Sequence, residues 1–155
     1  MPQIFQRALP IDPSSTWDFS LYVPDVVVSM IGGNDFAIGQ PVDDGPATLA
    51  AFTEGYAAFV ADIRSRYPRA HIFLVTSPSV YDDVPEGRAT RTNVMTGIAT
   101  VVARRKNAGD AKVYAVTPPM AVPDELKGCG GHGTPEFHER LANDLTPIIR
   151  AQTGW

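Results

Sequence analysis

The sequence predicts an α/β protein built around a parallel β-sheet. Three short apolar segments rich in β-branched residues alternate with three amphipathic helical segments, and proline and glycine fall between them. Strands that alternate with helices in this way pair in parallel through right-handed crossovers. The length of 155 residues fits one domain, so we expect a single domain over residues 1–155 with the order β-α-β-α-β-α.

The strands are expected at Val26–Ile31, Ile72–Val75 and Lys112–Val116, each followed by glycine or proline. Val26–Ile31 is the most apolar of the three, and its β-branched run is typical of a strand buried on both faces. Such a strand belongs in the middle of a sheet. We therefore expect that its neighbouring strands, and the N-terminal part of the fold, are absent from this chain.

The helices are expected over residues 46–67, over residues 89–107, and from an N-cap at Thr134 onward, where proline follows in the first turn. Pro147 should kink the last helix near its end. Residues 1–24, with four prolines, should be largely non-helical. The residues expected on the buried helix faces are Leu49, Phe52, Tyr56, Phe59, Ile63 and Tyr67, then Val94, Ile98, Val101 and Val102, then Phe137, Leu141, Leu145 and Ile148.

Composition excludes several classes of function. The net charge of −4 disfavours a nucleic-acid partner, because neutralising phosphates needs an excess of Lys and Arg. No apolar run approaches the ~20 residues of a membrane span, so no membrane partner is expected. A single cysteine, Cys129, allows neither an internal disulfide nor a cysteine-cluster zinc site, and no phosphate-binding motif is present, so no cofactor is expected. No signal peptide follows Met1, and the location of the protein stays unpredicted.

Two glycine-rich segments carry the candidate site. In open α/β sheets ligands bind outside the carboxyl ends of the strands. There the sequence places Gly32–Asp35, which includes Asn34, and Gly128–His132. A carboxamide N–H can stabilise an oxyanion, and an imidazole can act as general base and then general acid. Asn34 and His132 together therefore indicate an acyl-transfer site.

These segments also resemble a known family. Gly32–Asp35 resembles the G-x-N-D block of the SGNH (GDSL-type) hydrolases, and Gly128–His132 resembles their final histidine block. Further segments, such as Trp17–Ser20, resemble the C-terminal part of acetyl-xylan esterases of carbohydrate esterase family two. The resemblance implies a three-layer flavodoxin-like fold, here incomplete, and hydrolysis of small acetyl-type esters, including those on sugars. It implies that Asn34, with Gly33, belongs to the oxyanion hole and that His132 is the catalytic histidine.

The sequence departs from that family in three places. The nucleophile block Gly-Asp-Ser has no match, and neither does the second block that completes the oxyanion hole. Cys129 stands where an aspartate usually precedes the histidine by three residues. The resemblance then implies a Ser-His dyad oriented by a backbone carbonyl, while Asp124 and Glu125 remain open as a third member. The nucleophile stays unidentified, with Ser77 and Ser79 at the expected rim but without a nucleophile elbow.

Other interpretations remain beside the esterase. The chain can be a non-catalytic half-domain that forms a homo-oligomer through strand Val26 to Ile31, or a module that binds carbohydrate without turnover. Asp35 is expected to brace its loop and His138 to pack or cap the last helix. Three further acidic residues, Asp82, Asp83 and Glu86, are expected to lie in a solvated loop or, less favoured, to form a weak cation site.

Overall fold

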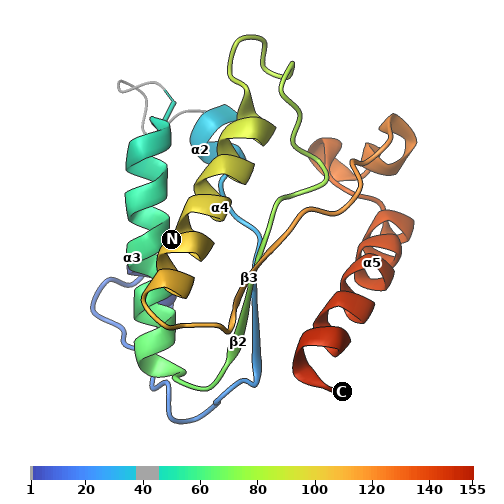
Figure 1. Cartoon of the computed structure of the whole chain (residues 1–155). Helices are drawn as coiled ribbons and strands as arrows, with labels where there is room; N and C mark the ends of the chain where they lie inside the picture. The colour runs from blue at the N-terminus through green and yellow to red at the C-terminus, as the bar shows by residue number, and fades with distance from the viewer. Residues whose placement is uncertain (1, 38–45) are drawn as a thin grey trace.

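A computed structural model describes residues 2–37 and 46–155, and a three-stranded parallel sheet lies at its centre (Figure 1). The strands are β1 (Val26–Ser29), β2 (His71–Val75) and β3 (Val113–Val116), in the spatial order β1-β2-β3. Ile72 at the middle strand is opposite Val27 on one side and Val113 on the other. The predicted parallel sheet is confirmed, with each outer strand shorter than expected.

Helices cover both faces of the sheet and make three layers (Figure 1). On one face, α3 (Leu49–Arg66) packs beside α4 (Thr90–Asn107), and α5 (Pro135–Thr153) lies on the other. None of the helices in the described residues has both the length and the apolar character that crossing a membrane needs. The short elements are α1 (Pro2–Phe5), α2 (Gly33–Ala37) and the 3₁₀ helices η1 (Pro123–Leu126) and η2 (Cys129–Gly131).

The larger core lies between the sheet and the pair α3 and α4. The residues expected on the buried face of α4 are all buried, and so are those of α3 and its C-cap except Leu49, which is half-buried. On α5 the expectation for Ile148 is wrong: it is 37% exposed, and Ile149 packs against the sheet instead. The packed row of α5 recurs every four residues through Leu141, Leu145 and Ile149, and Ile148 lies beside this row. The helix continues through Pro147 to Thr153.

Side-chain caps decide where α3 and α4 begin. The hydroxyl oxygen of Thr48 accepts the N–H of Ala51 at 3.1 Å, so α3 starts a turn later than Pro46. At α4, Asp82 accepts both the N–H of Thr92 at 2.8 Å and its hydroxyl at 2.6 Å. These hydrogen bonds lower the pKa of the Asp82 carboxyl. Asp82, expected in a solvated loop or at a cation site, is therefore a helix cap reached from outside the helix.

The N-terminal segment is held on α3 by aromatic contacts. The ring of Phe5 meets Phe59 edge-on at 5.2 Å, and the ring of Phe19 meets Tyr67 at 5.9 Å. The guanidinium of Arg66 lies 3.9 Å from the centroid of the Phe19 ring, in cation–π geometry. After α1, residues 6–24 contain no helix or strand, as the prolines predict.

β1 is an edge strand within the described residues, and this corrects the expectation that it is buried on both faces. Val28 is 45% exposed and Met30, just beyond the strand, is 41% exposed. On the sheet, the apolar cluster that includes Leu145 and Ile149 of α5 takes in residues of β2 and β3 but only Val26 of β1, which leaves the outer part of β1 uncovered. On the other face Ser29 is buried as expected, and its hydroxyl accepts that of Tyr56 at 2.9 Å.

Candidate active site

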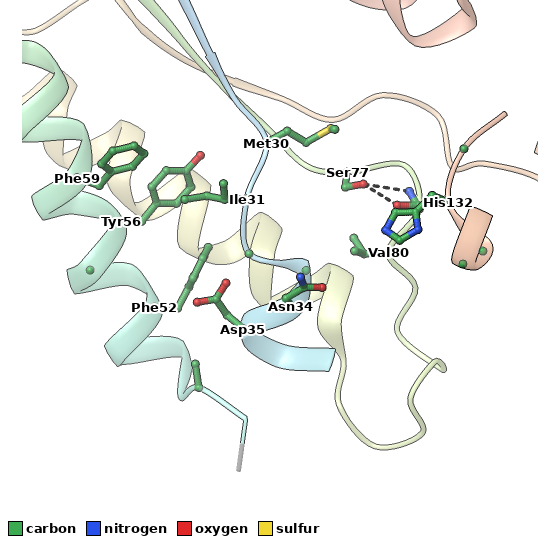
Figure 2. Close-up of a pocket in the computed structure, with 18 of the residues that line it drawn as sticks. Met30, Ile31, Asn34, Asp35, Phe52, Tyr56, Phe59, Ser77, Val80 and His132 are labelled. Atoms are coloured by element: carbon green, nitrogen blue, oxygen red, sulfur yellow. Dashed lines mark hydrogen bonds between the residues drawn. The ribbon is translucent and has the colours of Figure 1, made fainter. Parts of the chain in front are cut away.

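The structure brings Asn34 and His132 into one cleft at the carboxyl ends of the strands (Figure 2). The cleft has a volume of about 840 Å³. Phe52, Tyr56 and Phe59 of α3 line one part of it, while Ser77 and Val80 lie near Asn34 and His132. Two segments that are almost a hundred residues apart in sequence therefore meet at the predicted rim of the sheet.

Asn34 is presented by a backbone turn that only glycine tolerates. Gly32 has φ +113°, and a Cβ there would lie 2.8 Å from the ring of Phe52. Gly33 and Asn34 are the first two residues of α2, whose backbone N–H groups have no acceptor within the helix. The side chain of Asn34 is exposed in the cleft. Both backbone and side-chain donors are thus available at this point.

His132 is oriented by a backbone carbonyl. Its Nδ1 lies 2.9 Å from the carbonyl oxygen of Cys129, three residues earlier. A carbonyl oxygen only accepts, so this bond requires the proton on Nδ1 and leaves Nε2 of the neutral ring as an acceptor. Gly130, at φ +65°, makes the turn possible, and a Cβ there would lie 3.4 Å from Nδ1. Cys129 therefore acts through its backbone, and its exposed thiol does not hold the imidazole.

The two acidic alternatives to that carbonyl are occupied elsewhere. Glu125 binds the guanidinium of Arg140 through both carboxylate oxygens and accepts the N–H of Val122 at 2.9 Å. The Arg140 hydrogen bond, more than any other contact, lowers the pKa of the Glu125 carboxyl. Asp124 pairs with Lys127 at 2.7 Å. The pairing of Glu125 with Arg140 instead anchors η1 to α5, and η1 leads into residues 128–133, the histidine loop.

The histidine loop is closed on itself and packed against α5. The N–H of Gly128 donates to the carbonyl of His132 at 2.9 Å, and Gly133 lies so close to Phe137 that a Cβ there would come within 2.1 Å of the ring. His138 lines the cleft and its ring meets Phe137 edge-on at 5.3 Å, so it packs on α5 while remaining exposed. Within residues 2–37 and 46–155, no group of three potential ligands that could hold a metal ion is found.

Several cleft residues have no recognisable signal in the sequence. The helical pattern assigns Phe52, Tyr56 and Phe59 to the core, and each is buried, yet each also lines the cleft. Asp35 also lines the cleft, and Figure 2 shows its carboxylate beside Phe52 of α3. The backbone carbonyl of Asp35 accepts the N–H of Ala47. Apolar periodicity indicates that a helix face is buried, but the same pattern arises whether the face packs only in the core or also lines a cleft.

Comparison with known proteins places the chain in a class. The model of the GDSL-like lipase/acylhydrolase family matches residues 1–140, and the chain belongs to that family. It is 32% identical over 140 residues to the cellulase/esterase CelE of Acetivibrio thermocellus, covering 90% of this chain and 16% of that protein. It is 24% identical over 157 residues to an acetylxylan esterase/glucomannan deacetylase of Cellvibrio japonicus, covering 100% of this chain and 38% of that protein.

Solved structures give the same result with a finer family name. A family two carbohydrate esterase from Clostridium thermocellum, solved with cellohexaose, superimposes with a TM-score of 0.83 at 30% identity, covering 99% of this chain and 43% of that one. A carbohydrate esterase family 2 enzyme from Corynascus thermopiles (Myceliophthora fergusii) has a TM-score of 0.85 at 34% identity, covering 100% and 45%. The α/β fold is that of these carbohydrate esterases, and the chain spans less than half of their length.

Proposed function

We propose that this chain supplies the histidine and the oxyanion donor of a serine esterase that removes acetyl groups from sugars. The observation that carries the proposal is the 2.9 Å contact between Nδ1 of His132 and the carbonyl of Cys129, in the same cleft as Asn34. This contact gives the imidazole the tautomer and the orientation that a catalytic base needs. Asn34, with the adjoining Gly33, offers the N–H groups for the oxyanion.

The chemistry follows from these two positions. A serine Oγ attacks the acetyl carbonyl carbon while its proton passes to Nε2 of His132, and the carbonyl oxygen becomes an oxyanion held by Asn34. The C–O bond to the sugar then breaks, and the leaving sugar oxygen takes the proton from His132. Water attacks the acetyl-serine in the same manner, with His132 again as base, and releases acetate. In this scheme the carbonyl of Cys129 stabilises the imidazolium that forms in each half-reaction.

The nucleophile is the component that we propose to come from polypeptide outside these 155 residues. The sequence has no Gly-Asp-Ser block. Ser77 and Ser79 line the cleft, but they follow β2 without the strand–turn–helix geometry of a nucleophile elbow. Support comes from the relatives, because this chain covers only 43% of the family two esterase from Clostridium thermocellum.

The substrate class is proposed from the cleft and from the relatives. One wall of the cleft, formed by Met30, Ile31 and the aromatic residues of α3, is apolar. The polar residues of the cleft include Ser77 and Ser79, whose hydroxyls are uncharged. An uncharged acetylated sugar fits such a surface better than an anionic ligand does. The relative from Cellvibrio japonicus, an acetylxylan esterase/glucomannan deacetylase, agrees with this class.

We expect the 155-residue chain alone to hydrolyse p-nitrophenyl acetate at a rate close to that of buffer, since it lacks the nucleophile. A longer polypeptide that also carries the serine should turn over the ester. In that polypeptide His132→Ala should lower kcat/KM by about 10²–10⁴-fold. His71→Ala is the matched control and should change kcat/KM little, because His71 begins β2 and lies outside the cleft. Activity in the short chain that survives replacement of every serine, yet disappears with His132→Ala, would contradict the proposed mechanism.

A second candidate function is a half-domain that pairs with a second copy through β1. The observation that favours it is the exposure of Val28, at 45%, on an edge strand whose outer side has no pairing strand among the described residues. Such an edge offers unpaired N–H and C=O groups for pairing with another chain. Pairing across a two-fold axis would give a continuous six-stranded sheet.

Light scattering tests the pairing directly. We expect the wild-type chain to be a dimer at micromolar concentration and Val28→Lys to be monomeric, because a lysine on an edge strand opposes pairing with another chain. Met95→Lys is the control, since Met95 lies on the outer side of α4 and is 38% exposed. A wild-type chain that stays monomeric at every concentration would rule out this candidate.

A further inference from the structure

The loop after β2 places two serine hydroxyls side by side in the cleft. The Oγ atoms of Ser77 and Ser79 lie 2.8 Å apart, and the N–H of Ser79 donates to Oγ of Ser77 at 3.3 Å (Figure 2). Ser77 is half-buried and Ser79 is exposed, and both line the cleft with Asn34 and His132. The proposed chemistry uses neither hydroxyl, so the pair needs a separate explanation.

The hydrogen-bonding capacity of the pair can be counted. Two hydroxyls carry two protons, and the bond between the Oγ atoms uses one of them. The second proton remains available to a ligand in the cleft. Ser79 also keeps acceptor capacity, because the backbone N–H in this turn is directed at Ser77. A donor and an acceptor side by side match the hydroxyl of a sugar ring, which itself both donates and accepts.

Arg91, near the start of α4, holds this loop in place. Its guanidinium donates to the carbonyl of Ser77 at 3.3 Å and to the carbonyl of Pro118 at 3.2 Å, so it joins the ends of β2 and β3. The N–H of Ala121 donates to the carbonyl of Pro78 at 3.0 Å, which ties the same two loops a second time. The hydroxyl pair is therefore carried on a braced segment rather than on a free loop.

The serine loop also packs directly against the oxyanion turn. A Cβ on Gly33 would lie 2.8 Å from Cγ1 of Val80, so the two segments are in close contact. Figure 2 shows Val80 between the Asn34 turn and His132, with Ser77 beyond it. A ligand whose acetyl carbonyl lies at Asn34 would thus lie in the same cleft as the serine pair.

We propose that Ser77 and Ser79 form a subsite that binds a hydroxyl of the sugar bearing the ester, and that Arg91 is the positioning residue of this subsite. The inference rests on the proposed esterase function, and it names the part of the site that distinguishes an acetylated sugar from a simple acetyl ester. The ligand class is a neutral oligosaccharide with free ring hydroxyls. Hydrogen bonds to such hydroxyls supply binding and orientation and leave the reacting atoms to Asn34 and His132.

Calorimetric titration of the 155-residue chain with cellohexaose tests the subsite without requiring turnover. We expect the double variant Ser77→Ala/Ser79→Ala to weaken the Kd about tenfold, as the loss of two hydrogen bonds to a ligand implies. The matched control Ser14→Ala/Ser20→Ala removes two hydroxyls from the exposed N-terminal segment and should leave the Kd unchanged. A folded double variant that keeps the wild-type Kd would overturn the proposal, and so would a wild-type chain that binds no cellohexaose.

Arg91 is tested by the difference between two replacements. Arg91→Met should weaken cellohexaose binding about fivefold although both serines remain, while Arg91→Lys, which still donates to one carbonyl, should restore part of the affinity. Circular dichroism and thermal melting establish that each variant is folded. If both variants bound cellohexaose with the wild-type Kd, Arg91 would have no positioning role.

The outcomes also separate this inference from the esterase proposal. In a longer polypeptide that carries the serine, the Ser77/Ser79 double variant should raise KM for an acetylated cello-oligosaccharide by a larger factor than KM for p-nitrophenyl acetate, which has no sugar ring. Loss of cellohexaose affinity in the double variant, together with an inactive longer polypeptide, would support the subsite and refute the esterase. Activity that depends on His132 without any effect of the serine pair on either substrate would do the reverse.

Discussion

Replacing Arg64 with methionine is expected to lower the free energy of unfolding by about 3 kcal/mol, because it breaks a largely buried ion pair. The side chains of Arg64 and Asp110 are each 12% exposed, and Nε of Arg64 lies 2.9 Å from the carboxylate of Asp110. The same guanidinium donates to the carbonyls of Tyr67 at 3.0 Å and Ala70 at 2.6 Å. Methionine preserves most of the apolar stem, so the loss reports on the hydrogen bonds.

Acid should reduce the difference between wild type and Arg64→Met. Burial raises the pKa of the Asp110 carboxyl, but hydrogen bonds from Arg64 and Arg105 outweigh it, and the net shift is downward. A carboxyl whose pKa is lower in the folded state stabilises the fold above its unfolded pKa of about 3.9. This contribution is lost as the pH falls through the folded pKa. The two proteins should therefore differ fully above about pH 5 and progressively less below about pH 4.

Urea denaturation at several pH values measures both effects. The matched control is Arg104→Met, which removes an arginine of α4 that pairs with Glu54 of α3. Arg104 pairs with Glu54 at 2.7 Å, but the two side chains are 49% and 67% exposed, so the control should cost less than about 1 kcal/mol. Equal losses in the two variants would show that the burial of the Arg64 pair is energetically irrelevant.

Gly32→Ala is the second change with a large expected effect, again about 3 kcal/mol of unfolding free energy. At φ +113° an L residue is strained, which costs on the order of 1–3 kcal/mol. A Cβ would also meet the ring of Phe52 at 2.8 Å and a methyl of Val94 at 3.0 Å. Both neighbours are buried, so neither can move away cheaply. Because Gly32 sets the turn into Asn34, the variant should also disturb the cleft.

The control is Gly55→Ala on α3, where a Cβ would have no neighbour within 4 Å. Alanine in the interior of a helix is favoured over glycine by about 0.5–1 kcal/mol, so this variant should be slightly more stable than wild type. Thermal melting of both variants gives the comparison. A melting temperature of Gly32→Ala at or above the wild-type value would contradict the proposed packing of the turn.

Local patterns were sufficient for the elements whose signals are short-range. The alternation of strands and helices, the cap at Thr134 and the buried face of α4 follow from periodicity and from residue chemistry, and the structure confirms each of them. The helix α2 was not predicted, because Asn34 and Asp35 after two glycines favour a turn as readily as a helix. The start of α3 was predicted too early, since a proline at residue 46 and a threonine at residue 48 are both suitable for a helix start.

The sequence by itself determined the α/β class and the positions of Asn34 and His132 at the ends of strands, because glycine-rich turns after apolar runs are local signals. Only the tertiary structure decided that a carbonyl of Cys129 orients the imidazole, since every residue has a carbonyl and no residue type identifies this one. The structure likewise decided that Asp82 caps α4 from outside and that β1 lies at an edge of the described sheet. The first depends on how the loop before α4 folds back onto the helix, and the second on the order of the strands in the sheet. Hydrophobic periodicity records burial without recording the partner.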